Sequence, residues 1–117
     1  MIKYEKLPDD IDLRIPLAAE KLEEDPRVVF AYLFGSHVAG FQSPLSDIDI
    51  AVYLSSAGNE PEAKLDIFTY LSNALATDEL DLVILNTAPV SLTGRVLSNR
   101  RVIVDKEPFV RHEYESI

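Results

Sequence analysis

The stretch that decides the fold is Leu33-Phe-Gly-Ser-His-Val-Ala-Gly40, followed after a short polar segment by Ser46-Asp-Ile-Asp-Ile-Ala-Val52. An apolar run leads into the Gly-Ser pair, and a second apolar run continues from the Asp-Ile-Asp triplet. Both runs are rich in β-branched and aromatic residues and are bounded by turn residues, which is typical of strands. The sequence therefore predicts a Gly-Ser turn at the end of one strand and an acidic pair at the start of the next.

Helices and strands alternate on either side of this stretch. Apolar residues at helical spacing predict a helix over 11–24, with Pro16 near its start, and another over 61–76 with Leu65, Phe68, Leu71 and Leu75 on one stripe. Strands are expected over 27–34, 47–54, 80–85 and 101–105, and further helices over 91–99 and 108–116. A short turn and helix is expected over 36–45. The pattern indicates an α/β (α+β) domain with a small mixed sheet of about four strands flanked by helices.

The composition narrows the kind of protein. The chain has 117 residues, a net charge of -9, 47% hydrophobic residues and no cysteine. We therefore expect one domain over 1–117 without disulfides or cysteine-based zinc sites. With no apolar leader after Met1 and no run long enough for a bilayer, the expected compartment is the cytoplasm, away from membranes. The acidic balance argues against binding a nucleic-acid polymer, which depends on Lys and Arg contacts to phosphate.

Three acidic residues form a candidate metal site. Alternate residues of a strand point to one side, so Asp47 and Asp49 project together with Cα atoms about 6.5 Å apart. Asp81 lies within the strand over 80–85 and supplies a third carboxylate if that strand is a neighbour. Carboxylate oxygens are the ligands that Mg²⁺ prefers, and a pair of such ions, about 3.5–4 Å apart, suits this spacing. Each acid alone also fits an ordinary strand edge, so the prediction depends on their combination.

The Gly-Ser pair offers a phosphate site next to these acids. Gly35 allows the backbone to approach a ligand closely, and Ser36 provides a hydroxyl and an N–H to phosphate oxygens. The start of a following helix would add a partial positive charge. Although a lone Gly-Ser is usually a turn, its combination with the acids predicts a nucleoside triphosphate site.

At these residues the chain resembles the nucleotidyltransferase superfamily that includes DNA polymerase beta, whose motif is Gly-Ser, about ten residues, Asp-x-Asp and a later Asp. The short length, with the segments Ala88-Pro-Val-Ser-Leu92 and Val102-Ile-Val-Asp-Lys-Glu-Pro-Phe-Val-Arg-His-Glu-Tyr114, is similar to the minimal nucleotidyltransferase antitoxins that pair with HEPN-domain toxins. The resemblance covers most of the chain from about Val28.

The resemblance implies a metal-dependent transfer of AMP from ATP to a hydroxyl of a HEPN RNase toxin, typically a tyrosine. It implies that Gly35 and Ser36 hold the triphosphate, that Asp47 and Asp49 bind Mg²⁺, and that Asp81 binds the metal nearer the attacking hydroxyl. Assembly with the toxin is expected, and self-association stays open.

The chain departs from the family pattern after the Gly-Ser pair. Many members have Arg residues there, where this chain has His37 and Val38. Either His37 replaces the missing cation, or it is an ordinary turn residue and an arginine from later in the chain supplies the contact. The candidates for that contact are Arg95, Arg100 and Arg101.

Two other functions fit the same sequence. The protein would be a non-catalytic antitoxin that blocks a basic toxin surface by contact alone, or a transferase acting on a small molecule such as an aminoglycoside. The second alternative normally requires an added substrate-binding domain, for which 117 residues leave little room.

Overall fold

Four strands form one mixed sheet in the order β3-β2-β1-β4 in the computed structural model, which describes residues 6–39, 47–55 and 59–116. Strand β1 is antiparallel to both of its neighbours, whereas β2 and β3 are parallel. This arrangement confirms the predicted fold class. The strands are Val28–Phe34 (β1), Ile48–Leu54 (β2), Leu80–Ile84 (β3) and Arg100–Asp105 (β4).

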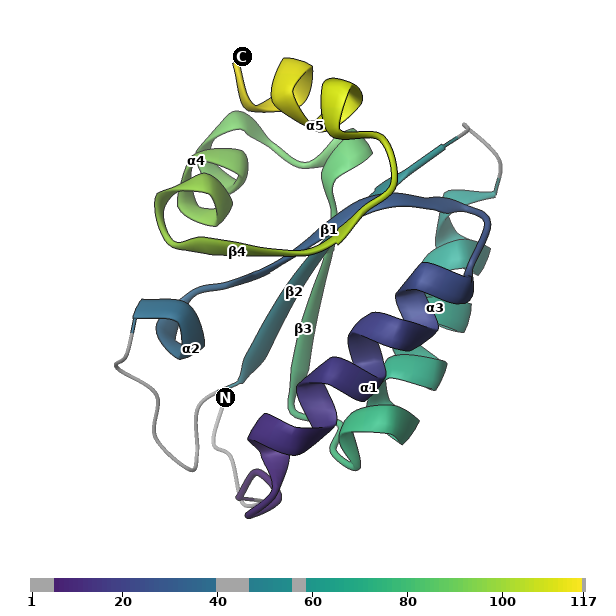
Figure 1. The fold of residues 1–117 in the computed structure, drawn as a ribbon, viewed down its shortest axis with the longest axis vertical. Coiled ribbons are helices and arrows are strands. Elements are labelled where there is room, and N and C mark those ends of the chain that lie inside the picture. The colour runs from purple at the N-terminus through teal and green to yellow at the C-terminus, as the bar shows by residue number, and fades with distance from the viewer. Residues whose placement is uncertain (1–5, 40–46, 56–58, 117) are drawn as a thin grey trace.

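Helices cover both faces of the sheet (Figure 1). Helices α1 and α3 lie side by side on one face, and α4 and α5 lie on the other. Helix α3 is also the crossover that a parallel pair such as β2 and β3 requires. The helices are Ile11–Glu24 (α1), Ser36–Ala39 (α2), Glu60–Leu75 (α3), Val90–Ser98 (α4) and Pro108–Glu115 (α5), with a short 3₁₀ helix at Leu85–Thr87 (η1).

The predicted elements agree with the observed ones to within a residue or two at each end. The expected turn and helix over 36–45 corresponds to α2 as far as residue 39, and its remainder lies outside the described residues. Within the described residues, no helix combines the length and the apolar character needed to cross a membrane.

Strand β1 lies at the centre of the molecule and is buried along its whole length. It has a hydrogen-bonded neighbour on each side, and its alternate side chains enter two separate cores. Ala31 and Leu33 face α1 and α3, whereas Tyr32 and Phe34 face α4 and α5. A continuous apolar run is what a strand covered on both faces requires.

The buried stripe of α3 differs from the predicted one. Ala63, Ile67, Leu71 and Leu75 face the core, while Leu65 is 67% exposed. The prediction of Leu65 as a core residue is therefore wrong. The predicted and observed stripes share Leu71 and Leu75. Packing against α1 and the sheet selects the residues that follow one another at a spacing of four.

Local signals account for the limits of the helices. Asn59 caps α3 by accepting a hydrogen bond from the N–H of Glu62 at 3.1 Å, and α3 ends where Ala76 adopts a left-handed conformation with φ 56°. Pro16, expected near a helix start, lies inside α1 beyond its first turn. There its ring removes a backbone donor within the helix.

Candidate active site

Residues at one end of the sheet form a row across all four strands. Asp81 of β3 pairs with Asp49 of β2, Asp49 pairs with Phe34 of β1, and Phe34 pairs with Arg100 of β4. Paired residues of neighbouring strands point to the same face, here the face that carries α4 and α5. The sheet therefore places two of the predicted acidic residues side by side, with a cation further along the same row.

The rest of this face is filled by aromatic side chains. Phe30 stacks on Tyr53 with ring centroids 4.8 Å apart and packs against Tyr32 and Tyr114. The Tyr32 hydroxyl donates to Glu115 of α5 at 2.7 Å. Burial raises the pKa of Tyr32, and the hydrogen bond to Glu115 and its charge raise it further. Asp49 and Asp81 thus lie in line with Phe34, at the end of β1 away from Phe30 and its aromatic neighbours.

Asp47 lies one residue before β2, rather than within it as predicted. Asp47 and Asp49 are both half-buried, and Asp81 is exposed. The acidic pair thus lies at the start of β2, with Asp47 just outside the strand and Asp49 as its second residue. Half-exposed carboxylates avoid most of the desolvation cost that a buried pair would incur.

Gly35 directly adjoins Asp49. It has φ +80°, and a Cβ built on it would collide with the carboxylate of Asp49. Its N–H donates to the carbonyl of Asn99 at 3.2 Å, which ties the end of β1 to the segment before β4. Glycine is required at this position because the backbone is left-handed and lies against an acidic side chain.

Ser36 begins α2 immediately after this glycine and is half-buried. From the sequence, we expected the start of a helix to add a partial positive charge at this point. Because α2 has four residues, few peptide dipoles are aligned and their contribution is small. The N–H of Gly35 already donates to Asn99, so the donors of this turn that we consider for a phosphate are the hydroxyl and N–H of Ser36.

The carboxylates suit a hard cation in their chemistry, and Gly35 leaves room beside Asp49 that any side chain would fill. Within residues 6–39, 47–55 and 59–116, no three His, Cys, Asp or Glu side chains are close enough together to form a ready-made metal cluster. Mg²⁺ commonly takes one or two carboxylates and completes its shell with water and substrate phosphates. The residues present therefore fit an ion that arrives with a nucleotide better than a permanently held one.

His37 lies in α2, directly after Ser36. Burial lowers its pKa, the charge of Asp12 acts against that change and the charge of Arg101 adds to it. Its Nδ1 is buried, with no hydrogen-bond partner in the described part of the chain. A lowered pKa favours the neutral imidazole, which brings no positive charge to a phosphate, so the interpretation of His37 as a turn residue is favoured.

The three candidate arginines lie in different environments. Arg101 pairs with Leu33 and so faces the α1 side of the sheet, and Arg95 is exposed on α4. Arg100 shares the row of Asp49, where its Nε lies 3.3 Å from Glu115 and its guanidinium donates to the carbonyl of Leu97. Of the three, Arg100 is the one that register places on the same face as the acidic pair.

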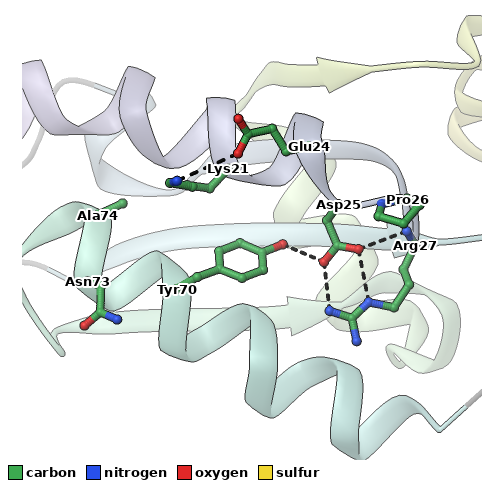
Figure 2. A pocket seen from close by; sticks show the side chains of 8 residues that line it. All are labelled: Lys21, Glu24, Asp25, Pro26, Arg27, Tyr70, Asn73 and Ala74. Carbon is green, nitrogen blue, oxygen red and sulfur yellow. Dashed lines mark hydrogen bonds and ion pairs between the residues drawn. The ribbon is translucent and has the colours of Figure 1, made fainter.

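A second acidic site, which the sequence analysis did not predict, lies at the opposite end of β1. Figure 2 shows the Tyr70 hydroxyl and the Arg27 guanidinium both directed at Asp25. Arg27 donates to this carboxylate from its backbone N–H and from two guanidinium nitrogens, and Tyr70 donates at 2.9 Å. Burial would raise the pKa of Asp25, but the hydrogen bonds from Arg27 and Tyr70 outweigh it and hold that pKa below its usual value. No periodicity or motif signals this network, because Tyr70 comes from a distant helix.

The chain belongs to the nucleotidyltransferase family: the family model described as polymerase beta, nucleotidyltransferase, matches residues 17–109. This match includes all four strands and the row of paired residues described above. The predicted resemblance to this family is therefore confirmed.

Solved structures of toxin–antitoxin pairs are similar to the chain. A toxin–antitoxin structure with AMP-PNP is 28% identical, over 86% of this chain and 81% of that one, with a TM-score of 0.71. An MntA–HpeT pair carrying two aspartate-to-glutamate substitutions is 27% identical over the same shares, also with a TM-score of 0.71. A tri-AMPylated Shewanella oneidensis HEPN toxin in complex with its MNT antitoxin is matched at 25% identity over 90% and 80% of the two chains, with a TM-score of 0.66. No curated protein matches the chain.

Proposed function

We propose that this protein is a minimal nucleotidyltransferase antitoxin that transfers AMP from ATP, with Mg²⁺, to a tyrosine hydroxyl of a HEPN-domain toxin. The observation that carries the proposal is the register pairing of Asp49 with Asp81 next to the left-handed Gly35. Membership of the nucleotidyltransferase family supports the chemistry. The solved pairs, one with AMP-PNP and one with an AMPylated HEPN toxin, support the donor and the acceptor.

Each residue of the site has a role in this proposal. Gly35 and Ser36 contact the triphosphate through the turn, and Asp47 and Asp49 hold Mg²⁺. Asp81 lies on the acceptor side, where its carboxylate orients the hydroxyl and receives or relays its proton. Bound Mg²⁺ would neutralise the charge that develops on the phosphates.

The reaction balances without a further reactant. The acceptor oxygen forms a bond to the α-phosphorus of ATP, the bond between the α-phosphorus and its bridging oxygen breaks, and pyrophosphate leaves. The hydroxyl proton passes to Asp81 or to solvent. Phosphoryl transfer depends mainly on how the reacting groups are positioned and how their charge is balanced. The paired carboxylates, with the Mg²⁺ that they would hold, can therefore support this reaction in a small protein.

Arg100 is the cation that we assign to the phosphates in place of the arginine absent after Ser36. It shares the row of Asp49, two strands away, and neighbouring strands are about 4.8 Å apart. Its ion pair with Glu115 holds the guanidinium at this face. We also propose that the protein is a single domain. Its proposed location is the cytoplasm, where both ATP and the toxin would be present.

The test is mass spectrometry of the HEPN-domain toxin after incubation with the protein, ATP and Mg²⁺. The proposal predicts the added mass of one or more AMP groups on a tyrosine, and no addition with the Asp49→Asn variant or without Mg²⁺. A toxin that gains no mass and is still inhibited would support a non-catalytic antitoxin instead. Transfer to an aminoglycoside but not to the toxin would support the small-molecule alternative.

A further inference from the structure

The two edge strands of the sheet, β3 and β4, differ in how many charged residues protect them, and this difference suggests where the acceptor protein binds. Edge strands expose unpaired backbone groups, and proteins commonly protect such edges with charged residues. Strand β4 has three charged residues among its six, namely Arg100, Arg101 and Asp105. Strand β3 is the other edge, and Asp81 is its one charged residue. The β3 edge is thus the less protected of the two.

The backbone of β3 presents hydrogen-bonding groups outward at alternate residues. The N–H of Ile48 donates to the carbonyl of Glu79, so Glu79, Asp81 and Val83 direct their backbone groups toward β2. The backbone groups of Leu82 and Ile84 consequently point away from the sheet. Among the described residues, neither of their N–H groups has a hydrogen-bond partner outside the sheet, whereas the carbonyl of Ile84 accepts the first bond of the 3₁₀ helix η1.

A groove follows this edge and begins at the candidate active site. Its volume is about 280 Å³, and it is lined by Asp81, by the three residues of β3 that follow Asp81, and by residues on both sides of the sheet. Lys64 of α3 forms part of one wall, and Leu92 of α4 forms part of the other. Thr87 donates to Glu60 at 2.7 Å and bounds the groove toward η1.

We propose that an extended segment of the acceptor protein pairs with β3 in this groove as a fifth strand, which brings its tyrosine hydroxyl to Asp81. The proposal rests on the function proposed above and adds how the acceptor is held. Main-chain pairing along an open edge gives affinity with little demand on sequence, and the groove walls contact alternate side chains. The groove shares Asp81 with the candidate site, so a segment lying in it leads directly to the acidic pair.

Hydrogen exchange at residue resolution tests the pairing, with the HEPN-domain toxin as the probe. The N–H groups of Leu82 and Ile84 should exchange at least about tenfold more slowly in the complex, because strand addition satisfies them. Those of Asp81 and Val83, which already pair with β2, should change little. The proposal would be overturned if toxin binding slowed exchange equally at all N–H groups of β3. It would also be overturned if the complex formed without slowing exchange at any of them.

A variant that fills the groove gives a second, independent measurement. Thr87 is exposed, so Thr87→Trp should fold normally while blocking the groove. It should raise the toxin concentration for half-maximal transfer by about tenfold. Thr87→Val, which exchanges the hydroxyl for a methyl group of similar size, should not. Thr69→Trp, at an exposed position of α3 that does not line this groove, is the matched control for bulk.

The measurements separate this proposal from the proposed function. If Thr87→Trp leaves the dependence on toxin concentration unchanged while Asp49→Asn abolishes transfer, the groove is wrong and the function stands. If the toxin never acquires AMP but Leu82 and Ile84 become protected, the docking stands and the catalytic function fails. Protection of the β4 backbone in place of β3 would contradict the docking whatever the transfer assay gives.

Discussion

The two ends of the sheet each hold carboxylates, but in opposite environments. At the start of β1, Asp25 is 8% exposed and accepts hydrogen bonds from Arg27 and Tyr70. At the other end, Asp49 and Asp81 lie side by side, half-buried and exposed respectively. A carboxylate enclosed by the chain's own donors stabilises the fold, whereas Asp49 and Asp81 are more exposed and place like charges side by side. We therefore expect Asp25 to matter for stability, and, under the proposed function, Asp49 and Asp81 to matter for transfer.

The largest expected effect is on catalysis. Asp49→Asn should lower AMP transfer by more than about 100-fold, because even an outer partner of a metal ligand can account for that much. The free energy of unfolding should change by no more than about 1 kcal/mol in either direction, because Asn keeps the shape of this half-buried side chain. Mass spectrometry and urea denaturation measure the two effects. Full activity in this variant, or in Asp47→Asn, would contradict the metal assignment.

Gly35→Ala should damage both activity and stability. The left-handed backbone costs a non-glycine residue about 1–2 kcal/mol, and the new Cβ would displace the carboxylate of Asp49. Gly94→Ala is the matched control, because a Cβ there meets no atom within 4 Å. It should stabilise α4 by about 0.5–1 kcal/mol without changing transfer. Equal effects of the two substitutions would show that the contact with Asp49 is unimportant.

Asp25→Asn should lower stability and leave AMP transfer unchanged, which is the opposite of the effect expected of Asp49→Asn. We expect a loss of about 2 kcal/mol in the free energy of unfolding, since the substitution leaves donors of Arg27 and Tyr70 poorly satisfied in a buried site. Transfer per folded molecule should be unchanged. Urea denaturation and a transfer assay at low temperature check the two parts. A specific loss of transfer without a loss of stability would give Asp25 a role in catalysis.

Tyr70→Phe removes one donor from the same carboxylate and keeps the ring. The expected loss is smaller, about 1 kcal/mol, because the contacts of Arg27 with Asp25 remain. The substitution should also bring the pKa of Asp25 closer to its usual value, since the Tyr70 hydrogen bond helps to lower it. Denaturation curves measure the stability, and carboxyl chemical shifts measure the titration. Identical curves for the variant and the wild type would mean that this hydrogen bond contributes nothing to stability.

The smallest effect concerns pH. The pKa of Asp25 is lower in the folded chain than in the unfolded one, so its stabilisation is complete above the unfolded pKa near 3.9. It is lost as the pH falls through the folded pKa. Between pH 7 and pH 4 the stability difference between wild type and Asp25→Asn should therefore shrink, by at most about 0.3 kcal/mol. A difference that grows toward low pH would have the wrong sign for this network.

The parts of the structure that sequence predicted best are those fixed by local patterns. Helix α1 begins and ends at the residues that its apolar spacing predicts. The Gly-Ser pair and the acids were recognised because their spacing along the chain is itself the signal. Asp81 was identified by residue type and position in a strand, and the parallel register with Asp49 supplied the reason for it.

What sequence analysis missed depends on contacts between distant segments. The orientation of α3, which buries Ile67 rather than Leu65, is decided by its packing against α1 and the sheet. The Asp25 network joins a loop to a helix through Tyr70, and the β3 groove exists only once α3 and α4 lie on opposite faces of the sheet. None of these arrangements has a periodicity that a single segment could reveal.

The parallel pairing of β2 and β3 also has a consequence for folding. The two strands are separated along the chain by the whole of α3, so closing this pair is a long-range event that carries a large loop entropy. Asp49 and Asp81 meet only when that closure is complete. A newly synthesised chain that has formed α1, β1 and β2 would therefore be compact yet inactive, and recovery of transfer during refolding would report the slowest step of assembly.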